Sequence, residues 1–148
     1  MQLFAVFLLT LSLFSMEAQA AEVAVIVNKE SSQNNISIND LARIYQGKKT
    51  SWSDGSSLMA INHPTDSPIR KIFYKGVLNA EPTAQFFQTN NPIPFKTLVQ
   101  QSGLAVKRLV SKMPNAIGYI AAEELDDSVK AVSIDNLVLK SKDYPLHD

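Results

Sequence analysis

Short apolar runs alternate with longer amphipathic segments along this chain, and this alternation restricts its fold more than any other feature. The runs are rich in β-branched residues, which is typical of buried strands. They cover residues 22–28, 58–62, 117–121 and 129–134. Apolar residues at helical spacing occupy several of the segments between them. This order predicts an α/β fold in which helices flank a mostly parallel sheet on both faces.

Capping residues locate the expected helices. Ser37 can cap a helix that begins at Ile38, and Gly47 is suited to its end. Ser67 followed by Pro68 fits the N-cap and the first position of the next helix. Three further segments are expected after these: a helix over 80–88, a long amphipathic helix over 97–113 and a surface tail over 137–148.

The N-terminal residues have the composition of a signal peptide. The run Leu3–Phe14 is apolar, and Ala18-Gln19-Ala20 matches a small-residue cleavage pattern. A helix that crosses a membrane needs about twenty apolar residues, so this run is too short for one. We therefore expect a signal peptide over 1–20, a single domain over 21–148 and a periplasmic location. No Lys or Arg precedes the run, which leaves an uncleaved membrane anchor as the alternative.

The composition excludes several classes of site. The 14 basic and 14 acidic side chains balance, so no basic stripe for nucleic acid is expected. Without cysteine, the chain has no disulfide, no thiol nucleophile, no Cys-bound metal and no lipidated cysteine. Two histidines are too few for a His-rich metal site, and neither has a triad partner at a recognisable spacing. We expect no enzyme activity, no cofactor, no metal site and no membrane span after cleavage.

The strongest candidate site is the turn that leads from the 58–62 run into the helix beginning at Pro68. The first N–H groups of a helix lack partners within it and attract anions. Thr65 and Ser67 offer hydroxyl groups, and Arg70 offers a planar guanidinium for a phosphate or carboxylate. The turn therefore predicts a small-oxyanion site. The alternative is an ordinary serine cap beside a solvent-facing arginine.

Other conspicuous side chains are expected to have structural roles. Trp52 is expected to pack against the preceding helix, and His63 to be a structural histidine at a strand end. Lys48 and Lys49 are expected to be solvated. Phe86 and Phe87 are expected to face the core or a partner, with the core favoured. The acidic residues Glu123, Glu124, Asp126 and Asp127 are expected to form a solvated turn.

Four segments together carry a family resemblance. Residues 38–55 hold an Ile-Tyr-x-Gly-Lys helix end followed by a Trp-x-Asp-Gly turn, and residues 67–73 hold a serine loop that leads to Phe73. Residues 110–115 end a helix with Pro-Asn, and residues 116–120 read Ala-Ile-Gly-Tyr-Ile. In this order the chain resembles the phosphate-type periplasmic substrate-binding proteins of ABC transporters.

The resemblance implies a two-lobed fold that closes on an oxyanion, of which this chain is expected to form one periplasmic-binding-protein-like (type II) lobe. Ser67 and Arg70 carry over as ligand candidates, and Gly118 and Tyr119 as structural residues. The residues after Ser67 are Pro68-Ile69 where the family has Gly-Thr.

One lobe supplies one wall of a binding cleft, so we expect phosphate-like anions to bind at about millimolar concentration or weaker. The alternative is an envelope adaptor that uses the same scaffold to bind a protein. An envelope protein or a second copy of the chain could then cover apolar surface.

Overall fold

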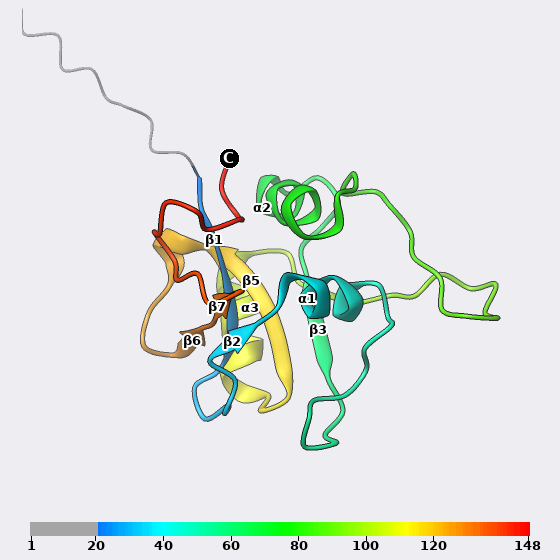
Figure 1. Cartoon of the computed structure of the whole chain (residues 1–148), viewed down its shortest axis with the longest axis horizontal. Coiled ribbons are helices and arrows are strands. Elements are labelled where there is room, and N and C mark those ends of the chain that lie inside the picture. Colours follow the sequence, from blue (N-terminus) through cyan, green and yellow to red (C-terminus); the bar gives the residue numbers. More distant parts are fainter. Residues whose placement is uncertain (1–20) are drawn as a thin grey trace, which may run out of the picture.

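The computed structural model describes residues 21–148, and the expected signal peptide lies outside the described residues. A five-stranded sheet in the order β4-β3-β5-β1-β6 forms the centre of this part, beside a two-stranded sheet β2-β7 (Figure 1). The strands are β1 (Val23–Asn28), β2 (Asn35–Ile36), β3 (Met59–Asn62), β4 (Leu98–Val99), β5 (Ala116–Ala121), β6 (Val129–Ala131) and β7 (Ser133–Ile134). The helices are α1 (Ile38–Tyr45), α2 (Pro68–Phe73), the π-helical turn η1 (Tyr74–Leu78), α3 (Gly103–Lys112) and the 3₁₀ turn η2 (Ala122–Glu124).

The strand pairings confirm the expected α/β fold class. Strand β3 runs parallel to β4 and β5, and β2 runs parallel to β7. Strand β1 is the exception, because it runs antiparallel to both of its neighbours, β5 and β6. Its position inside the sheet buries all six of its residues, which explains why this run has no polar alternation.

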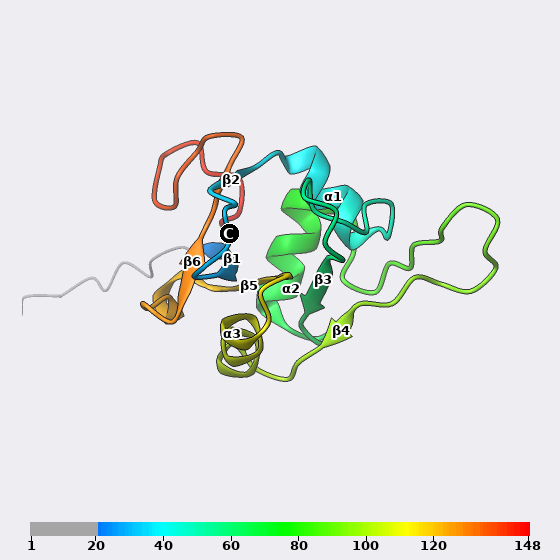
Figure 2. The ribbon, with the colours of Figure 1, turned by 90° about the horizontal axis from the view of Figure 1, so that it is seen from below.

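Helices cover both faces of the sheet, as expected (Figure 2). Val25 and Val27 of β1 belong to the larger core cluster, which includes residues of α1, α2 and η1. Ala24 and Ile26 belong to the second cluster, which includes residues of α3. A Cβ atom at Gly118 of β5 would lie 2.8 Å from a methyl carbon of Val106 in α3, so glycine permits this close approach.

The starts expected for the first two helices are confirmed. The Ser37 hydroxyl accepts a hydrogen bond from the Asp40 N–H at 3.0 Å at the start of α1. Ser67 is the N-cap of α2, and Pro68 occupies the first helical position. Gly47 follows α1 with φ of +73°, a left-handed conformation that favours glycine. Local sequence chemistry therefore sets these boundaries.

One expected helix is wrong, and another is shorter than expected. Residues 80–88 contain no helix. In the segment expected to form one helix over 97–113, residues Leu98–Val99 pair with β3 instead, and α3 begins at Gly103. The Ser102 hydroxyl caps α3 by accepting from the Ala105 N–H at 3.1 Å. The sheet contact and this cap together override the apolar spacing that favoured a longer helix.

The expected surface tail is also wrong, because the C-terminal segment closes the core. Tyr144 and Leu146 are 1% and 0% exposed. The Tyr144 hydroxyl donates to the Val23 carbonyl at 2.8 Å, and the Val23 N–H donates to the Leu146 carbonyl at 2.8 Å. The segment thus lies beside the start of β1 (Figure 1). Among residues 21–148, no helix has the length and apolar character needed to cross a bilayer.

We predict that Leu146→Ala lowers the free energy of unfolding by about 2–4 kcal/mol, because it leaves a cavity in the core. The matched control is Val138→Ala, since Val138 is 63% exposed. That control is expected to change stability by less than about 0.5 kcal/mol. Urea denaturation followed by circular dichroism measures both. Equal losses in the two variants would contradict a core role for the C-terminal segment.

Candidate functional site at the end of strand β3

A buried polar cluster lies where β3 ends. The Asn62 side-chain N–H groups donate to the Tyr74 hydroxyl at 3.0 Å and to the Thr97 hydroxyl at 3.1 Å. Its side-chain oxygen accepts from the Tyr119 hydroxyl and from the His63 N–H. All the hydrogen-bonding capacity of this amide is therefore used within the chain. The cluster ties β3 to η1, to β5 and to the segment that precedes β4.

His63 is a neutral, structural histidine in this cluster. Its Nε2 lies 2.7 Å from the Tyr119 carbonyl oxygen, and because a carbonyl can only accept, Nε2 carries the hydrogen. Burial lowers the pKa of His63, and the nearby Arg70 charge adds to this effect. Burial likewise raises the pKa of Tyr119 far above its ordinary value, so that hydroxyl stays protonated. The structural role expected for His63 is consistent with this geometry.

Arg70 points into the chain rather than toward solvent, and it is 8% exposed. Its Nη1 donates to the His63 carbonyl at 2.8 Å, and its Nε donates to the Pro82 carbonyl at 2.8 Å. The guanidinium carbon lies 4.4 Å from the centre of the Tyr74 ring, a cation–π contact. Arg70 therefore holds the end of β3 against the segment that follows η1.

The two hydroxyl candidates lie nearer to solvent than Arg70. Thr65 is exposed, and Ser67 is half-buried. The Ser67 hydroxyl accepts from the Arg70 N–H at 3.4 Å, and its carbonyl accepts from the Lys71 N–H at 3.1 Å. Pro68 has no N–H to offer. The first turn of α2 thus keeps few free donors, and the Arg70 guanidinium is bonded to the His63 and Pro82 carbonyls instead.

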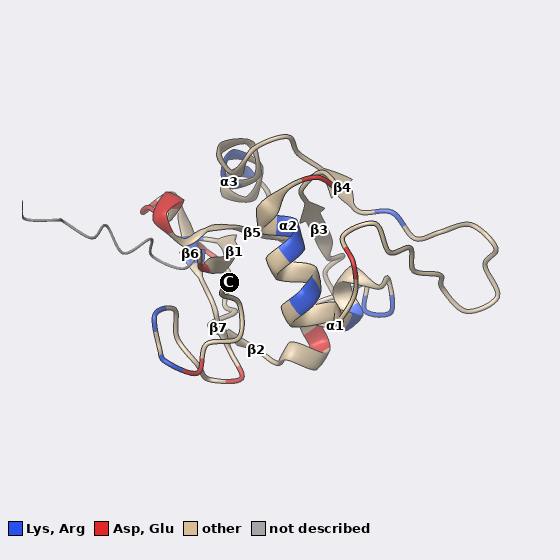
Figure 3. Cartoon of the chain, turned by 90° about the horizontal axis from the view of Figure 1, so that it is seen from above, with Lys and Arg blue, Asp and Glu red and all other residues tan. Residues whose placement is uncertain are grey.

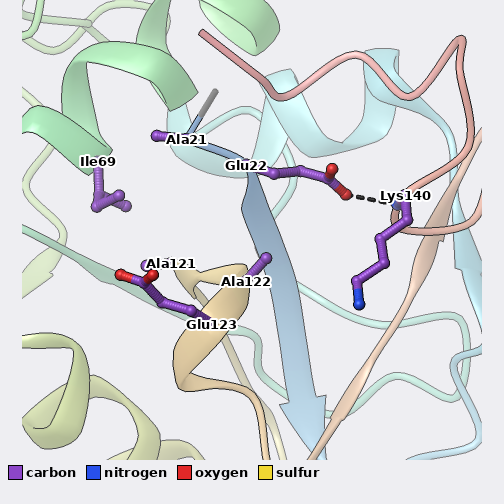
Figure 4. A pocket seen from close by; sticks show the side chains of 7 residues that line it. All are labelled: Ala21, Glu22, Ile69, Ala121, Ala122, Glu123 and Lys140. Atoms are coloured by element: carbon purple, nitrogen blue, oxygen red, sulfur yellow. Dashed lines mark hydrogen bonds between the residues drawn. The ribbon is translucent and has the colours of Figure 1, made fainter. Parts of the chain in front are cut away.

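A cavity of about 680 Å³ lies between the start of β1, η2 and the start of α2 (Figure 4). Its lining residues are Ala21, Glu22, Ile69, Ala121, Ala122, Glu123 and Lys140. The Glu22 carboxylate accepts a hydrogen bond from the Lys140 backbone N–H. The cavity is lined by two carboxylates and one ammonium group, so its net charge is negative and disfavours an anion. Of the expected turn, only Ile69 borders it, so the cavity is not the expected oxyanion site.

Several other side chains singled out in the sequence stabilise local structure. Trp52 is buried, and its indole N–H donates to the Asn115 carbonyl at 3.0 Å. In the acidic turn, the Asp126 carboxylate lies 2.7 Å from the Lys107 ammonium nitrogen and accepts from Ser128. Those bonds hold the pKa of Asp126 below its usual range. Phe86 packs against the core, as favoured, whereas Phe87 is 50% exposed, which corrects the core placement favoured for it.

Sequence reasoning assigned structural roles to His63 and Tyr119 but missed Asn62 and Thr97, and it did not predict that these residues form one buried cluster. The cluster draws on three separate segments of the chain, which contribute Asn62, Thr97 and Tyr119. No local sequence pattern therefore links these residues. One signal was present: Asn62 is a polar residue that ends an apolar strand, where a buried amide needs several partners.

We predict that stability falls as the pH is lowered below about 6.5, the ordinary pKa of histidine. Below that pH the unfolded chain binds a proton at His63 that the folded chain resists, so unfolding becomes favoured. Unfolding at several pH values is to be compared for His63→Gln and for His147→Gln, which alters the exposed histidine. Only His63→Gln is expected to reduce the pH dependence of the unfolding free energy below pH 6.5. An unchanged pH dependence in that variant would contradict the conclusion that folded His63 resists protonation.

We predict that Arg70→Ala destabilises the fold by about 2–4 kcal/mol, because hydrogen bonds from a charged group to buried carbonyls are strong. The control is Lys71→Ala on the same helix, where the side chain is exposed. That control is expected to stay within about 0.5 kcal/mol of the wild type. Thermal and urea unfolding measure both. A fully stable Arg70→Ala protein would show that the guanidinium is free to serve another purpose.

Comparison with known proteins supports the expected family. The phosphate-binding protein PstS of Bacillus subtilis (strain 168) is 30% identical to this chain over 135 residues, which are 84% of this chain and 41% of that protein. This chain spans less than half the length of that relative.

Solved structures match the fold. An ABC-type phosphate transport receptor from Vibrio cholerae superimposes with a TM-score of 0.70 at 22% identity, covering 80% of this chain and 48% of that one. PstS from Borrelia burgdorferi gives a TM-score of 0.70 at 20% identity, covering 86% and 55%. At these identities the match establishes the fold.

The model of the family described as "PBP superfamily domain" matches residues 11–146. Because that match covers nearly the whole chain, the protein belongs to the PBP superfamily domain family.

Proposed function

We propose that this chain is an exported, non-catalytic module of the phosphate-binding-protein type, which binds a small phosphate-like oxyanion weakly at the turn from Thr65 to Arg70. In this proposal residues 1–20 are a signal peptide, residues 21–148 are a single periplasmic domain, and the oxyanion is its ligand. The family match and the similarity to a phosphate-binding protein support the ligand class.

The observation that carries the proposal is the position of two hydroxyl groups at a helix start. Strand β3 leads into α2 through Thr65, which is exposed, and Ser67, which is half-buried. An anion held there would contact the hydroxyls and the positive end of the short helix. Arg70 would contribute by keeping the turn in place through its bonds to the His63 and Pro82 carbonyls.

Several features make this contact weak. Pro68 removes one N–H donor, and Asp66 adds a negative charge beside the turn. Each donor on an exposed wall also binds water, and salt screens the attraction. We expect a dissociation constant of about 1 mM or larger, which corresponds to about 4 kcal/mol of binding free energy or less.

We predict that phosphate shifts the backbone amide NMR signals of residues 65–71 and that saturation needs millimolar concentrations. Thr65→Val removes a hydroxyl at nearly constant size and is expected to weaken binding several-fold. Thr83→Val, at another exposed threonine, is the matched control and is expected to bind as the wild type does. Sodium chloride at equal ionic strength separates specific binding from screening. Micromolar affinity, or shifts confined to other residues, would contradict the proposal.

A second candidate function is an envelope adaptor that binds a protein instead of an anion. The inward position of Arg70 favours it, because the strongest anion-binding group of the turn is already bonded within the chain. The Thr65→Val variant distinguishes the two functions. It should weaken anion binding under the first proposal and leave protein association intact under the second.

A further inference from the structure

Residues 82–122 form the longest stretch of the chain without an acidic side chain. Its four basic residues are Lys96, Lys107, Arg108 and Lys112. The same stretch holds five of the six large hydrophobic residues that stand exposed in residues 21–148. They are Phe87, Ile93, Leu98, Val99 and Leu104. Exposed apolar groups and positive charge are therefore concentrated in one part of the chain.

Helix α3 directs its basic residues to two different sides. The Lys107 ammonium group donates to the Glu124 carbonyl at 2.8 Å and lies 2.7 Å from the Asp126 carboxylate, so this side of α3 faces η2. Arg108 and Lys112 are four residues apart and are therefore neighbours on another side of the helix. Both are exposed, and neither forms an ion pair within residues 21–148. The charge of α3 is thus neutralised toward η2 but not on the side of Arg108 and Lys112.

A groove of about 250 Å³ lies on the side of α3 that carries Arg108 and Lys112. Gln100, which directly follows β4, lines it together with Ala105 and Leu109 of α3. Its two charged lining residues are both basic. The groove therefore combines apolar side chains with two cations and joins α3 to the end of β4.

The arm, residues 81–97, extends this surface beyond β4 and projects from the body of the domain (Figures 1 and 2). Lys96 lies at its base, is exposed and forms no ion pair within residues 21–148. In Figure 3 the blue residues of α3 and the blue band of Lys96 lie on the same side of the molecule, with β4 between them. The arm, β4 and the Arg108 side of α3 together form what we call the basic face.

The arm is anchored at Gly47 and carries its apolar groups outward. The Gln88 side-chain N–H donates to the Gly47 carbonyl at 2.9 Å, and the Phe95 ring lies so close to Gly47 that a Cβ atom there would meet it at 2.5 Å. Phe87 and Ile93 are nevertheless 50% and 66% exposed. The arm thus holds two large apolar side chains away from the core, next to the cations of the basic face.

From this arrangement we infer that the basic face binds an anionic lipid surface. Such a surface carries phosphate groups above hydrocarbon, so it matches both the charge and the apolar groups of the face. Lys96, Arg108 and Lys112 contact the lipid phosphates, and Phe87 and Ile93 enter the boundary of the hydrocarbon. The contact is peripheral, because no helix within residues 21–148 has the length and apolar character to cross a bilayer.

An acidic protein would also attract these cations, but the shape of the face favours lipid. A protein interface needs a partner surface that is complementary in shape, and a projecting arm demands a matching groove. A fluid lipid layer adapts to the arm without such a groove. Lipid also removes Phe87 and Ile93 from water, whereas a purely charged partner leaves them exposed.

Vesicle co-sedimentation of the full chain tests this inference. The chain is expressed with its N-terminal segment, and mass spectrometry establishes that all variants share one N-terminal residue, so that this end contributes equally to each. The wild type is expected to sediment with vesicles of equal parts phosphatidylglycerol and phosphatidylcholine, and far less with phosphatidylcholine alone. Sodium chloride is expected to weaken the binding, because it screens the charges.

Paired charge variants show whether the basic face makes the contact. Each basic residue near an anionic surface strengthens binding about fivefold, so Arg108→Gln combined with Lys112→Gln is expected to weaken it about 20-fold. Lys29→Gln combined with Lys142→Gln removes the same charge from two exposed residues elsewhere. This control is expected to bind nearly as well as the wild type.

Fluorescence shows whether the arm enters the lipid. The emission of Phe87→Trp is expected to shift to shorter wavelength when phosphatidylglycerol vesicles are added, because the indole leaves water. Val138→Trp, at an exposed valine outside the basic face, is expected to show no shift. Both variants retain the buried Trp52, which gives them the same background.

Four results would overturn the inference. They are a wild type that does not bind the anionic vesicles, equal losses in the two paired variants, equal behaviour of the two tryptophan variants, and binding to immobilised polyglutamate without binding to vesicles. The last would identify an acidic protein as the partner. Circular dichroism confirms that each variant is folded. Thr65→Val is expected to bind vesicles as the wild type does, so this inference and the proposed oxyanion site can fail separately.

Discussion

The side-chain amide of Asn62 is the contact on which both the candidate site and the outer strand β4 depend. Through it, β3 is bonded to Tyr74 of η1, to Tyr119 of β5 and to Thr97 just before β4. An unpaired buried amide costs about 1–3 kcal/mol, so these partners must stay in place together. Thr97 brings Leu98 and Val99 to the outer edge of the sheet. The same amide therefore fixes the turn toward α2 and the position of the outer strand β4.

The direction of Arg70 decides how much anion binding the turn can support. Each bond from its guanidinium to a buried carbonyl is worth about 1.5–3 kcal/mol, because one partner is charged. A contact between an exposed arginine and an anion at the surface contributes about 0–1 kcal/mol. The inward contacts of Arg70 are therefore more stabilising than a contact with an anion at the surface would be. Anion binding is left to Thr65, Ser67 and the short helix, which is why we expect it to be weak.

Local chemistry made the strand and cap positions predictable from sequence. The unbroken β-branched run of β1 indicates burial on both faces, and Ser37, Gly47 and Ser67 act through atoms a few residues away. The resemblance in residues 38–55 and 116–120 predicted the family. The same reasoning failed over 97–113, because Leu98 and Val99 fit a helix locally but bond to a strand that is distant in sequence.

The sequence by itself determined the fold class, the starts of α1 and α2, the exclusion of cysteine chemistry and the place of the candidate turn, since these follow from spacing and residue type. Only the tertiary structure decided that Arg70 bonds to the carbonyls of His63 and Pro82, that Tyr144 and Leu146 complete the core, and that Leu98 and Val99 form the outer strand β4. Each of these features depends on groups that come from separate segments of the chain. A local sequence pattern does not indicate which distant groups will lie close together in the fold.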